Sequence, residues 1–271
     1  FGQVIVRRPA PVATWQPSLA SNIWNDAQLV FTRGGPAEAG WKTLSQIPDA
    51  WRLRLDGFTL EMRPAAQGQI GVFPEQLPNW RRIQDAIARR GRNELKVLNC
   101  FGYTGASTLA AAAASEHMEV THLDASACAV SWASRNAELS GLSSRPIHWL
   151  TEDALTYLRR EARRGKIYDG LIFDPPAFGR GAKGKTWQLE RDLPELLLLA
   201  GKLLSRENGF CLLSAHAPGY TPDKLAALLA GTIGQNGPTT QIEAGELCIN
   251  ALSGGHNLPA GAYAWMDDFK K

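Results

Sequence analysis

The chain has 271 residues, of which 44% are hydrophobic and 20% are charged. This composition excludes a disordered chain or a coiled coil and predicts one large domain, or one domain with an appendage. The formal net charge of +3 permits an anionic partner without requiring one. No apolar run approaches the roughly 18 residues of a membrane span, and the start lacks the apolar core of a signal peptide, so we expect a cytoplasmic protein.

The cysteines form no recognisable framework. Cys100, Cys128, Cys211 and Cys248 contain no CxxC pair and have no histidine at ligand spacing. We therefore expect buried thiols in a reducing compartment, with neither a disulfide framework nor a metal site.

The first third of the chain reads as an N-terminal extension, residues 1–92. Residues 1–50 show no clear hydrophobic period, so we expect irregular backbone there. Residues 51–64 alternate apolar and polar residues on both sides of Asp56-Gly57, which predicts a small β-hairpin. Residues 78–92 have a helical period and should form a lead-in helix.

From residue 93 to residue 271 short apolar runs alternate with amphipathic helical stretches. This alternation predicts an α/β fold: a doubly wound, mostly parallel seven-stranded Rossmann-like sheet with helices on both faces. The predicted strands cover residues 96–100, 119–124, 146–150, 167–174, 209–215, 239–249 and 260–266. The predicted helices cover about 105–116, 126–140, 154–164, 187–205 and 221–234.

In such sheets ligands bind at the carboxyl ends of the strands. The first strand runs into Phe101-Gly-Tyr-Thr-Gly105, where two glycines permit a tight turn and a close approach to a ligand in front of a helix. The GxxG spacing differs from the GxGxxG of a dinucleotide fold, so a dehydrogenase is disfavoured.

Two aspartates follow the next strands. Asp124 lies 19 residues beyond Gly105, where a carboxylate can accept both hydroxyls of a ribose. Alternatively, it caps the helix that starts after Ser126. Asp153 follows the third strand, where it could accept from an adenine amino group or simply cap the helix that begins at Ala154.

The sharpest signal is Asp174-Pro-Pro-Ala-Phe178, which ends the fourth strand. A carboxylate at the end of a buried run, followed by two prolines that stiffen the backbone, predicts a loop that grips a flat acceptor group, with Phe178 stacked on it. His216 follows the fifth strand at the same edge. It is the candidate base that titrates near neutrality, or else a rim histidine bonded to backbone.

These four strand ends together resemble the class I S-adenosylmethionine-dependent methyltransferases, over about residues 70–270. The form NCFGYTG at 99–105, with DPPAF at 174–178, is similar to the bacterial 23S ribosomal RNA large-subunit methyltransferases. Residues 71–79, 134–142 and 258–263 resemble three further segments of that group.

The resemblance implies that S-adenosyl-L-methionine is the cofactor. It implies a cofactor-binding role for Phe73, Gln76, Asn99, Phe101, Gly102, Tyr103, Thr104, Gly105, Asp124, Ala125, Ser126, Asn136, Asp153, Ala154 and Asp174. The catalytic residues expected are Asp174, Pro175, Pro176, Phe178 and His216.

The chain departs from that group in two respects. Its members carry a PUA or THUMP domain, for which residues 1–50 are too short. Members that make 5-methylcytosine have a cysteine after the fifth strand, where this chain has Leu213-Ser-Ala-His216. Because covalent addition to a pyrimidine requires a thiolate, we exclude that reaction and expect direct transfer to a nitrogen or oxygen of RNA, most plausibly ribosomal RNA.

Residues 179–186 match the P-loop expression GxxxxGK[ST]. The surrounding sequence disfavours a true P-loop, because four residues separate the predicted strand from the matching segment. We favour a flexible basic loop in which Arg180, Lys183 and Lys185 hold an RNA phosphate backbone. A nucleotide-binding protein that uses residues 179–186 and a non-catalytic RNA-binding pseudo-methyltransferase are the alternative functions.

Overall fold

The computed structural model describes residues 1–34, 39–65, 68–91, 94–181, 185–233, 241–252 and 255–268. They form two compact units. The first comprises Phe1–Pro74 and Cys248–Pro259, and the second comprises Glu75–Leu247 and the chain from Ala260 onward. The lead-in helix that follows residue 76 therefore belongs to the second unit.

The first unit contains two small sheets. Strands β1 (Val6–Arg7), β2 (Leu29–Thr32) and β3 (Gly40–Thr43) form one sheet, and a short helix α1 (Ser21–Asn25) lies between β1 and β2 in the sequence. The prediction of irregular backbone over residues 1–50 is wrong at these strands. They are two to four residues long, too short for an alternating pattern to stand out.

The predicted hairpin is confirmed. Strands β4 (Trp51–Leu55) and β5 (Phe58–Met62) pair antiparallel. Asp56 and Gly57 both have positive φ, at 51° and 87°, as a two-residue type I′ turn requires.

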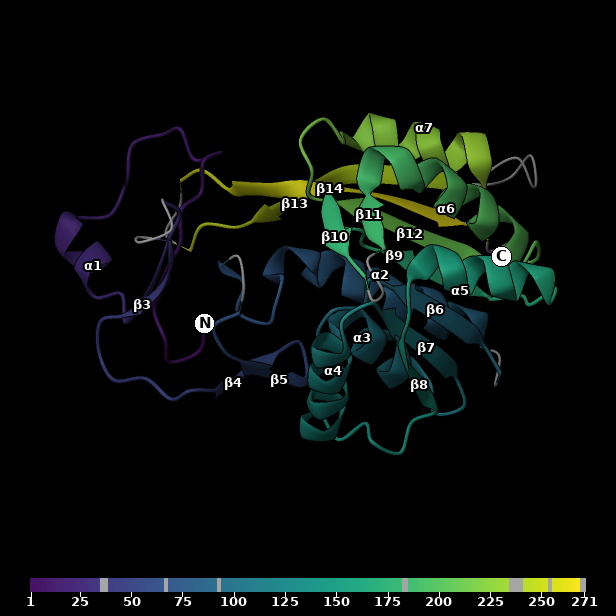
Figure 1. Ribbon diagram of the computed structural model, residues 1–271, viewed down its shortest axis with the longest axis horizontal. Coiled ribbons are helices and arrows are strands. Elements are labelled where there is room, and N and C mark those ends of the chain that lie inside the picture. The colour runs from purple at the N-terminus through teal and green to yellow at the C-terminus, as the bar shows by residue number, and fades with distance from the viewer. Residues whose placement is uncertain are drawn as a thin grey trace. The chain divides into compact units, whose positions relative to one another are not determined.

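The second unit is built on a seven-stranded sheet in the order β13-β14-β12-β9-β6-β7-β8 (Figure 1). Strand β14 pairs antiparallel with β12, whereas the pairs from β12 through β9, β6 and β7 to β8 are parallel. The prediction of a doubly wound, mostly parallel α/β sheet is confirmed. Its strands are β6 (Lys96–Cys100), β7 (Glu119–Asp124), β8 (Ile147–Thr151), β9 (Gly170–Phe173), β12 (Phe210–Ala215), β13 (Gln241–Ile249) and β14 (Leu258–Asp267).

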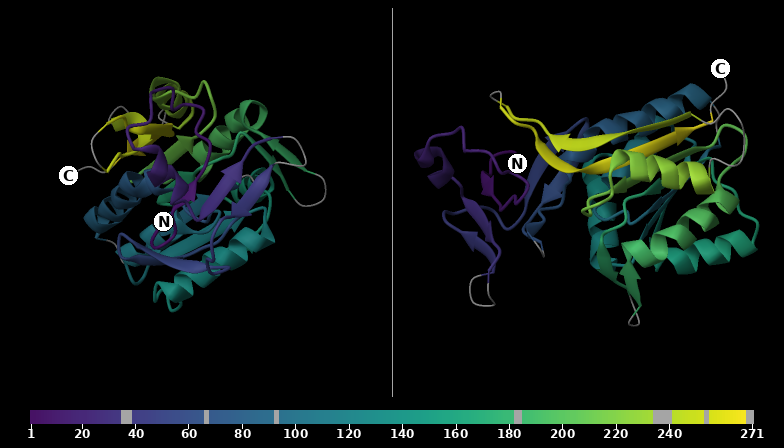
Figure 2. Two further views of the ribbon diagram at one scale, coloured as in Figure 1. Left: turned by 90° about the vertical axis from the view of Figure 1, so that its left-hand side faces the viewer. Right: turned by 90° about the horizontal axis from the view of Figure 1, so that it is seen from above.

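Helices follow the strands as predicted, and β13 and β14 close the sheet as two long neighbouring strands (Figure 2). Helix α6 starts two residues later than predicted, because Trp187 and Gln188 belong to the preceding strand β11 (Thr186–Gln188). The helices are α2 (Leu77–Arg90), α3 (Ala106–Ala114), α4 (Ala127–Leu139), α5 (Ala154–Arg163), α6 (Leu189–Leu203) and α7 (Pro222–Thr232).

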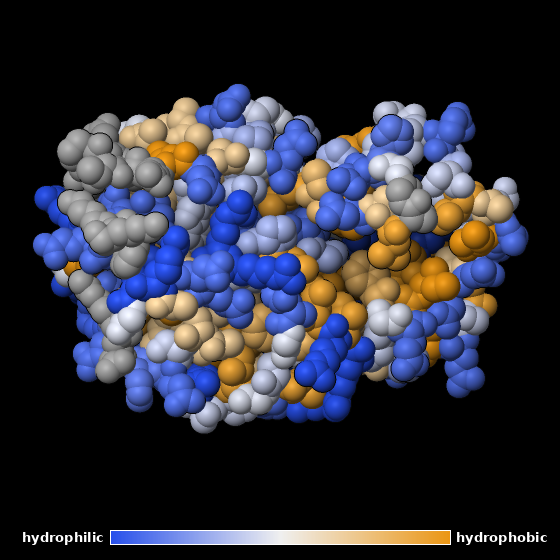
Figure 3. Space-filling model, turned by 180° about the vertical axis from the view of Figure 1, so that it is seen from behind, coloured by the Kyte–Doolittle hydropathy of each residue, from blue (hydrophilic) through white to orange (hydrophobic). Residues whose placement is uncertain are grey.

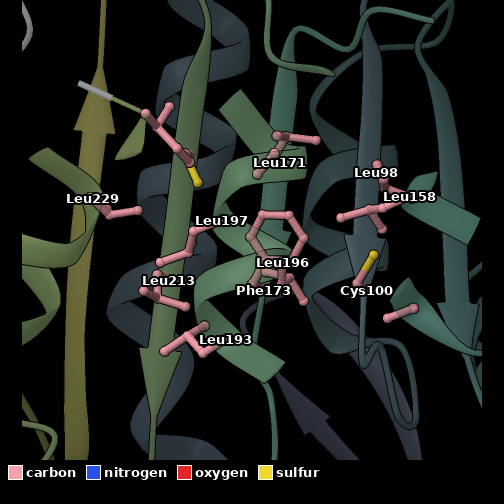
Figure 4. Packing of buried hydrophobic residues seen from close by; sticks show 14 of the residues in the cluster. Leu98, Cys100, Leu158, Leu171, Phe173, Leu193, Leu196, Leu197, Leu213 and Leu229 are labelled. Atoms are coloured by element: carbon pink, nitrogen blue, oxygen red, sulfur yellow. The ribbon is translucent and has the colours of Figure 1, made fainter. Parts of the chain in front are cut away.

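The sheet buries both of its faces. In β9, Leu171 and Phe173 pack in a core with residues of α5, α6 and α7, whereas Ile172 packs in a second core with residues of α2 and α3. Figure 4 shows the first core, to which Phe173 of β9 and Leu196 of α6 both belong. Because successive strand residues point to opposite faces, the continuous apolar runs in the sequence place one core on each face and leave the strand ends for polar side chains.

The surface is mixed. One face shows hydrophilic residues with hydrophobic residues interspersed (Figure 3). None of the helices in the described part of the chain has the length and hydropathy required to span a bilayer.

Candidate active site

Five chain segments meet at the carboxyl-terminal edge of the parallel strands. Phe101 follows β6, Asp124 ends β7, Asp153 follows β8, Asp174 follows β9 and His216 follows β12. Because β12, β9, β6, β7 and β8 are parallel neighbours, these residues share one edge of the sheet. The strand order reverses between β6 and β9, the switch point at which open α/β sheets bind ligands.

The loop after β6 has an unusual backbone. Phe101, Tyr103 and Gly105 have positive φ, at 59°, 47° and 90°, a conformation that is uncommon for aromatic residues and that the surroundings must stabilise. Part of this stabilisation comes from Asp124, whose Oδ2 accepts a hydrogen bond from the Tyr103 backbone N–H at 2.9 Å. The loop is therefore tied to the end of the neighbouring strand.

Both loop glycines are required by close packing. A Cβ on Gly102 would lie 2.4 Å from the ring of His122, and one on Gly105 would lie 2.8 Å from the Cβ of Ala133. The loop therefore lies directly on β7 and α4, with no room for a side chain at either position.

Two asparagines predicted to contact the cofactor support this loop from within the protein. The Asn99 side chain donates to Thr108 Oγ1 at 2.9 Å, and the Asn136 side chain donates to the Thr104 carbonyl at 2.9 Å. Both asparagines are buried. Direct contact of their side chains with a cofactor stays a prediction.

His122 was not singled out from the sequence, yet it lies beneath the glycine loop. Its Nδ1 is 2.8 Å from Thr108 Oγ1, and burial lowers its pKa to about 3, so the ring is neutral. The available signal was a histidine two positions before Asp124 in the same strand, because residues two apart in a strand share a face.

Asp124 is held by backbone donors from both sides. Besides Tyr103, the Ser126 backbone N–H donates to its Oδ1 at 2.8 Å. Burial raises the pKa of Asp124, and the two N–H donors oppose this shift without cancelling it. Ser126 itself caps α4 by accepting from the Ala129 N–H, and Ala125 connects the two polar residues.

Asp153 caps α5, as one of the two interpretations of the sequence expected. Its Oδ1 accepts from the Thr156 backbone N–H at 2.9 Å, and the helix begins at Ala154. Lys185 Nζ lies 3.8 Å from the same oxygen and donates to Thr156 Oγ1. Capping does not test the predicted adenine contact, which stays a prediction.

Asp174 is held by side chains from other parts of the chain. Its Oδ1 accepts from Ser214 Oγ at 2.6 Å and lies 3.2 Å from His216 Nε2. Its Oδ2 accepts from Gln76 Nε2 at 3.1 Å, and the same nitrogen is 3.0 Å from Ser214 Oγ. Gln76, predicted to contact the cofactor, is here a partner of Asp174, and Ser214 was not predicted at all.

His216 forms an ion pair with this carboxylate. Its Nδ1 lies 2.6 Å from the Ala260 carbonyl and 3.8 Å from Glu75 Oε1, so both ring nitrogens face acceptors. Burial alone lowers the pKa of His216, but the charge and hydrogen bond of Asp174, with the Ala260 carbonyl and Glu75, raise it to about 9.

The pKa of Asp174 moves the other way. Burial raises it, but the charge of His216 and the donors around the carboxylate outweigh burial and lower it. At neutral pH the pair is a carboxylate and an imidazolium. The raised pKa of His216 does not agree with a base that titrates near neutrality, whereas the contact with the Ala260 carbonyl agrees with the alternative of a rim histidine bonded to backbone. A catalytic role of His216 stays a prediction.

The two prolines after Asp174 are anchored by Trp187, which the sequence analysis missed. Trp187 Nε1 donates to the Pro176 carbonyl at 2.7 Å, and its ring packs against that of Phe101 at 4.8 Å between centroids. Pro175 is buried, whereas Phe178 has 52% of its surface exposed. The loop therefore presents an aromatic ring to solvent from a fixed backbone.

The described ends of the segment that matches the P-loop expression pair with each other as strands. Strands β10 (Phe178–Arg180) and β11 (Thr186–Gln188) pair antiparallel, with Arg180 opposite Thr186. A P-loop instead connects a strand to a helix whose N-terminus binds the phosphates. The ends of the expression thus face each other in a ladder, and this geometry does not fit a nucleotide phosphate site.

The basic residues predicted to hold RNA differ in their surroundings. Arg180 and Lys185 are exposed, but Lys185 is engaged with Asp153 and Thr156. Lys183 lies outside the described residues. Phe73 belongs to the first compact unit, and its predicted cofactor contact stays a prediction. In the described part of the chain, no group of three or more His, Cys, Asp or Glu side chains is arranged to hold a metal ion.

Comparison with known proteins identifies the family of this fold and site. The family model described as S-adenosylmethionine-dependent methyltransferase matches residues 9–223. A crystal structure of an S-adenosylmethionine-dependent methyltransferase from Agrobacterium tumefaciens is 36% identical, with a TM-score of 0.87, and the match covers 97% of this chain and 84% of that one. A second structure, a methyltransferase candidate complexed with SAH, has a TM-score of 0.71 at 18% identity, covers 91% of this chain and 63% of that one, and shares the fold.

Two curated relatives are ribosomal RNA large subunit methyltransferases. The K/L protein of Magnetococcus marinus is 29% identical over 55% of this chain and 20% of its own length. The I protein of Erwinia tasmaniensis is 34% identical over 43% of this chain and 29% of its own length. This chain thus matches less than a third of either protein. The family match and the Agrobacterium tumefaciens structure confirm the resemblance found in the sequence: the chain belongs to the family of S-adenosylmethionine-dependent methyltransferases.

Proposed function

We propose that this protein transfers the methyl group of S-adenosylmethionine to a nitrogen or oxygen of RNA, with ribosomal RNA as the favoured acceptor. Family membership supports the cofactor. The ribosomal RNA methyltransferases among the relatives support the acceptor, although they match only over a part of their length. The observation that carries the proposal is the Asp174 carboxylate, held at the sheet edge by Gln76, Ser214 and His216, four residues before the exposed ring of Phe178.

The residues at this edge fit the proposed cofactor. S-adenosylmethionine carries two ribose hydroxyls, an adenine amino group, an ammonium group and a cationic sulfur, all of which favour anionic acceptors. Asp124, Asp153 and Asp174 supply three carboxylates at the same edge of the sheet, on both sides of β6, and the glycine loop that follows β6 packs closely on His122 and Ala133. A structural neighbour of the same fold was solved with SAH. When bound, the cofactor supplies an electrophilic methyl group with a good leaving group.

The protein then has to align a nucleophile and exclude water. Asp174 is suited to accept a hydrogen bond from the N–H or O–H of the acceptor, because it is anionic and its position is held by three side chains. In this scheme His216 keeps Asp174 ionised and does not itself remove a proton. Trp187 keeps the Pro175-Pro176 turn in place.

The exposed side chains of β10 are suited to contact a nucleic acid. Phe178 is exposed at the start of β10, and Arg180 is exposed two residues later. A base can stack on the phenyl ring while the guanidinium contacts a phosphate. The arginines of α5 contribute less, because Arg159 and Arg160 are paired with Glu195 and Glu152.

The test is methyl transfer in vitro. Purified protein is incubated with isotope-labelled S-adenosylmethionine and unmodified large-subunit ribosomal RNA transcript, and the digested RNA is examined by mass spectrometry. We expect one labelled nucleotide methylated on nitrogen or oxygen, and none with Asp174→Ala. Binding of S-adenosylhomocysteine without any transfer to RNA would favour the pseudo-methyltransferase alternative.

Calorimetry distinguishes the proposed methyltransferase from the remaining alternative, a nucleotide-binding protein. We expect S-adenosylhomocysteine to bind and ATP to bind weakly or not at all. Tight binding of ATP without binding of S-adenosylhomocysteine would overturn the proposal in favour of nucleotide binding by residues 179–186.

A further inference from the structure

Three polar side chains lie one helical turn apart on α2 and its cap. Gln76 is the N-cap residue of α2, and Asn79 and Arg82 follow at intervals of three residues. This spacing places them on the same face of the helix. Gln76 and Asn79 have 4% and 0% of their surfaces exposed, so their amides must find partners within the protein.

These side chains form one hydrogen-bonded chain. Arg82 donates to Asn79 Oδ1 at 3.3 Å, and Asn79 Nδ2 donates to Gln76 Oε1 at 2.7 Å. Gln76 Nε2 then donates to Asp174 Oδ2. At its outer end Arg82 donates to the Tyr263 hydroxyl at 2.6 Å, which anchors the guanidinium to β14.

The chemistry of the Arg82 guanidinium sets the donor-to-acceptor direction of this whole series of hydrogen bonds. A guanidinium can only donate hydrogen bonds, so it selects the oxygen end of the Asn79 amide. The Asn79 nitrogen then faces Gln76 and selects its oxygen. The Gln76 nitrogen is left to face Asp174 and Ser214, where a flipped amide would place an oxygen against the carboxylate.

We infer that Gln76, Asn79 and Arg82 form an amide relay that orients the catalytic-loop aspartate, so that they are positioning residues for methyl transfer. This inference rests on the proposed function. It replaces the expected cofactor contact of Gln76 by a role exerted through Asp174.

The first measurement needs no activity. In the apo protein, side-chain amide resonances are followed by NMR, and the Gln76 pair is identified by its loss in Gln76→Leu. We expect slow hydrogen exchange of this amide in the wild type, because both of its hydrogens are donated inside the protein. Asn79→Asp keeps the shape and the oxygen that Arg82 contacts but removes the donor to Gln76, and should accelerate exchange by about ten-fold or more.

Gln84→Leu is the matched control, because it makes the same chemical change on α2 away from the relay. It should leave the Gln76 amide unchanged. Should Asn79→Asp prove unstable, Asn79→Leu tests the same loss of a donor. An unchanged Gln76 amide in a folded Asn79 variant would overturn the relay.

The second measurement uses transfer to the ribosomal RNA transcript. Gln76→Leu should lower kcat by about ten- to a hundred-fold through misplacement of Asp174, with S-adenosylhomocysteine affinity changed by less than about two-fold. Because Asn79 acts through Gln76, the Gln76→Leu/Asn79→Asp double variant should be no slower than Gln76→Leu. A merely structural role would make the two losses add.

The two proposals fail in different ways. Weakened S-adenosylhomocysteine binding in Gln76→Leu, with kcat retained, would overturn the relay and restore the cofactor contact. Absence of transfer by the wild type would count against the proposed function, and the amide exchange measurement would still decide the relay.

Discussion

The two sides of the active edge are built differently. On the side of β7 and β8, Asp124 and Asp153 accept hydrogen bonds from the backbone N–H groups of Ser126 and Thr156, two and three residues further along the chain. On the side of β9 and β12, the partners of Asp174 include Gln76, 98 residues away. One side relies on backbone donors, of which only the Tyr103 N–H, which donates to Asp124, is distant in sequence. The other side relies on side chains that come together only after the chain has folded.

Under the proposed function, this difference corresponds to the two tasks of the enzyme, which are cofactor binding and methyl transfer. Backbone donors at a strand end orient carboxylates for binding, and they do so whatever the neighbouring side chains are. The carboxylate of Asp174 instead depends on a charged partner and a set of side chains from α2 and β12. We therefore expect substitutions on the β7 side to change cofactor affinity and substitutions on the β9 side to change the rate.

The largest effect expected is that of Asp174→Ala. It removes the acceptor for the substrate proton and leaves His216 without its partner, so kcat should fall by about a thousand-fold or more. S-adenosylhomocysteine affinity, measured by calorimetry, should stay within a few-fold. Activity close to that of the wild type would show that this loop is not the catalytic loop.

Asp124→Ala should instead change cofactor affinity much more than kcat. Loss of two charge-assisted hydrogen bonds to the ribose should weaken S-adenosylhomocysteine binding by roughly a hundred-fold, or about 3 kcal/mol. The kcat at saturating cofactor should change far less. Because Asp124 also holds the Tyr103 N–H, a thermal unfolding scan controls for a displaced loop. Unchanged affinity in a folded variant would contradict the assignment.

The Asp174–His216 pair should make stability depend on pH. The pKa of His216 rises from its ordinary 6.5 to about 9 in the folded protein, so the contribution of the pair is complete below pH 6.5. It is lost as the pH rises through 9. Urea unfolding between these values should show a decrease of the order of 2 kcal/mol in the free energy of unfolding, which His216→Gln abolishes. A decrease that persists in His216→Gln would place its origin elsewhere.

The smallest effect expected is that of Phe178→Ala. The ring is 52% exposed, so its loss should cost little stability. If an acceptor base stacks on it, KM for the RNA should rise about ten-fold with kcat nearly unchanged. Phe178→Tyr, which keeps an aromatic face, should behave like the wild type. An unaltered KM in the alanine variant would remove stacking from the proposal.

Much of the fold followed from local pattern. Continuous apolar runs between amphipathic stretches indicated the parallel sheet, and Asp56-Gly57 indicated the hairpin. Short strands were missed, in residues 1–50 and at β10 and β11, because two to four residues carry no measurable period. The P-loop match is misleading in the opposite way, since residues 179–186 satisfy the letters of the motif while the strands at its ends, β10 and β11, pair antiparallel.

The candidate site likewise has one part that the sequence predicts and another part that it does not. The sequence by itself determined which residues end the strands, because parallel βα units bring their carboxyl ends to one edge wherever the helices lie. Only the tertiary structure decided that Gln76 and Ser214 contact Asp174, and that His216 is charged. A pKa and a hydrogen-bond direction depend on the atoms within a few ångströms of a group, and those atoms come from segments that the order of residues leaves far apart.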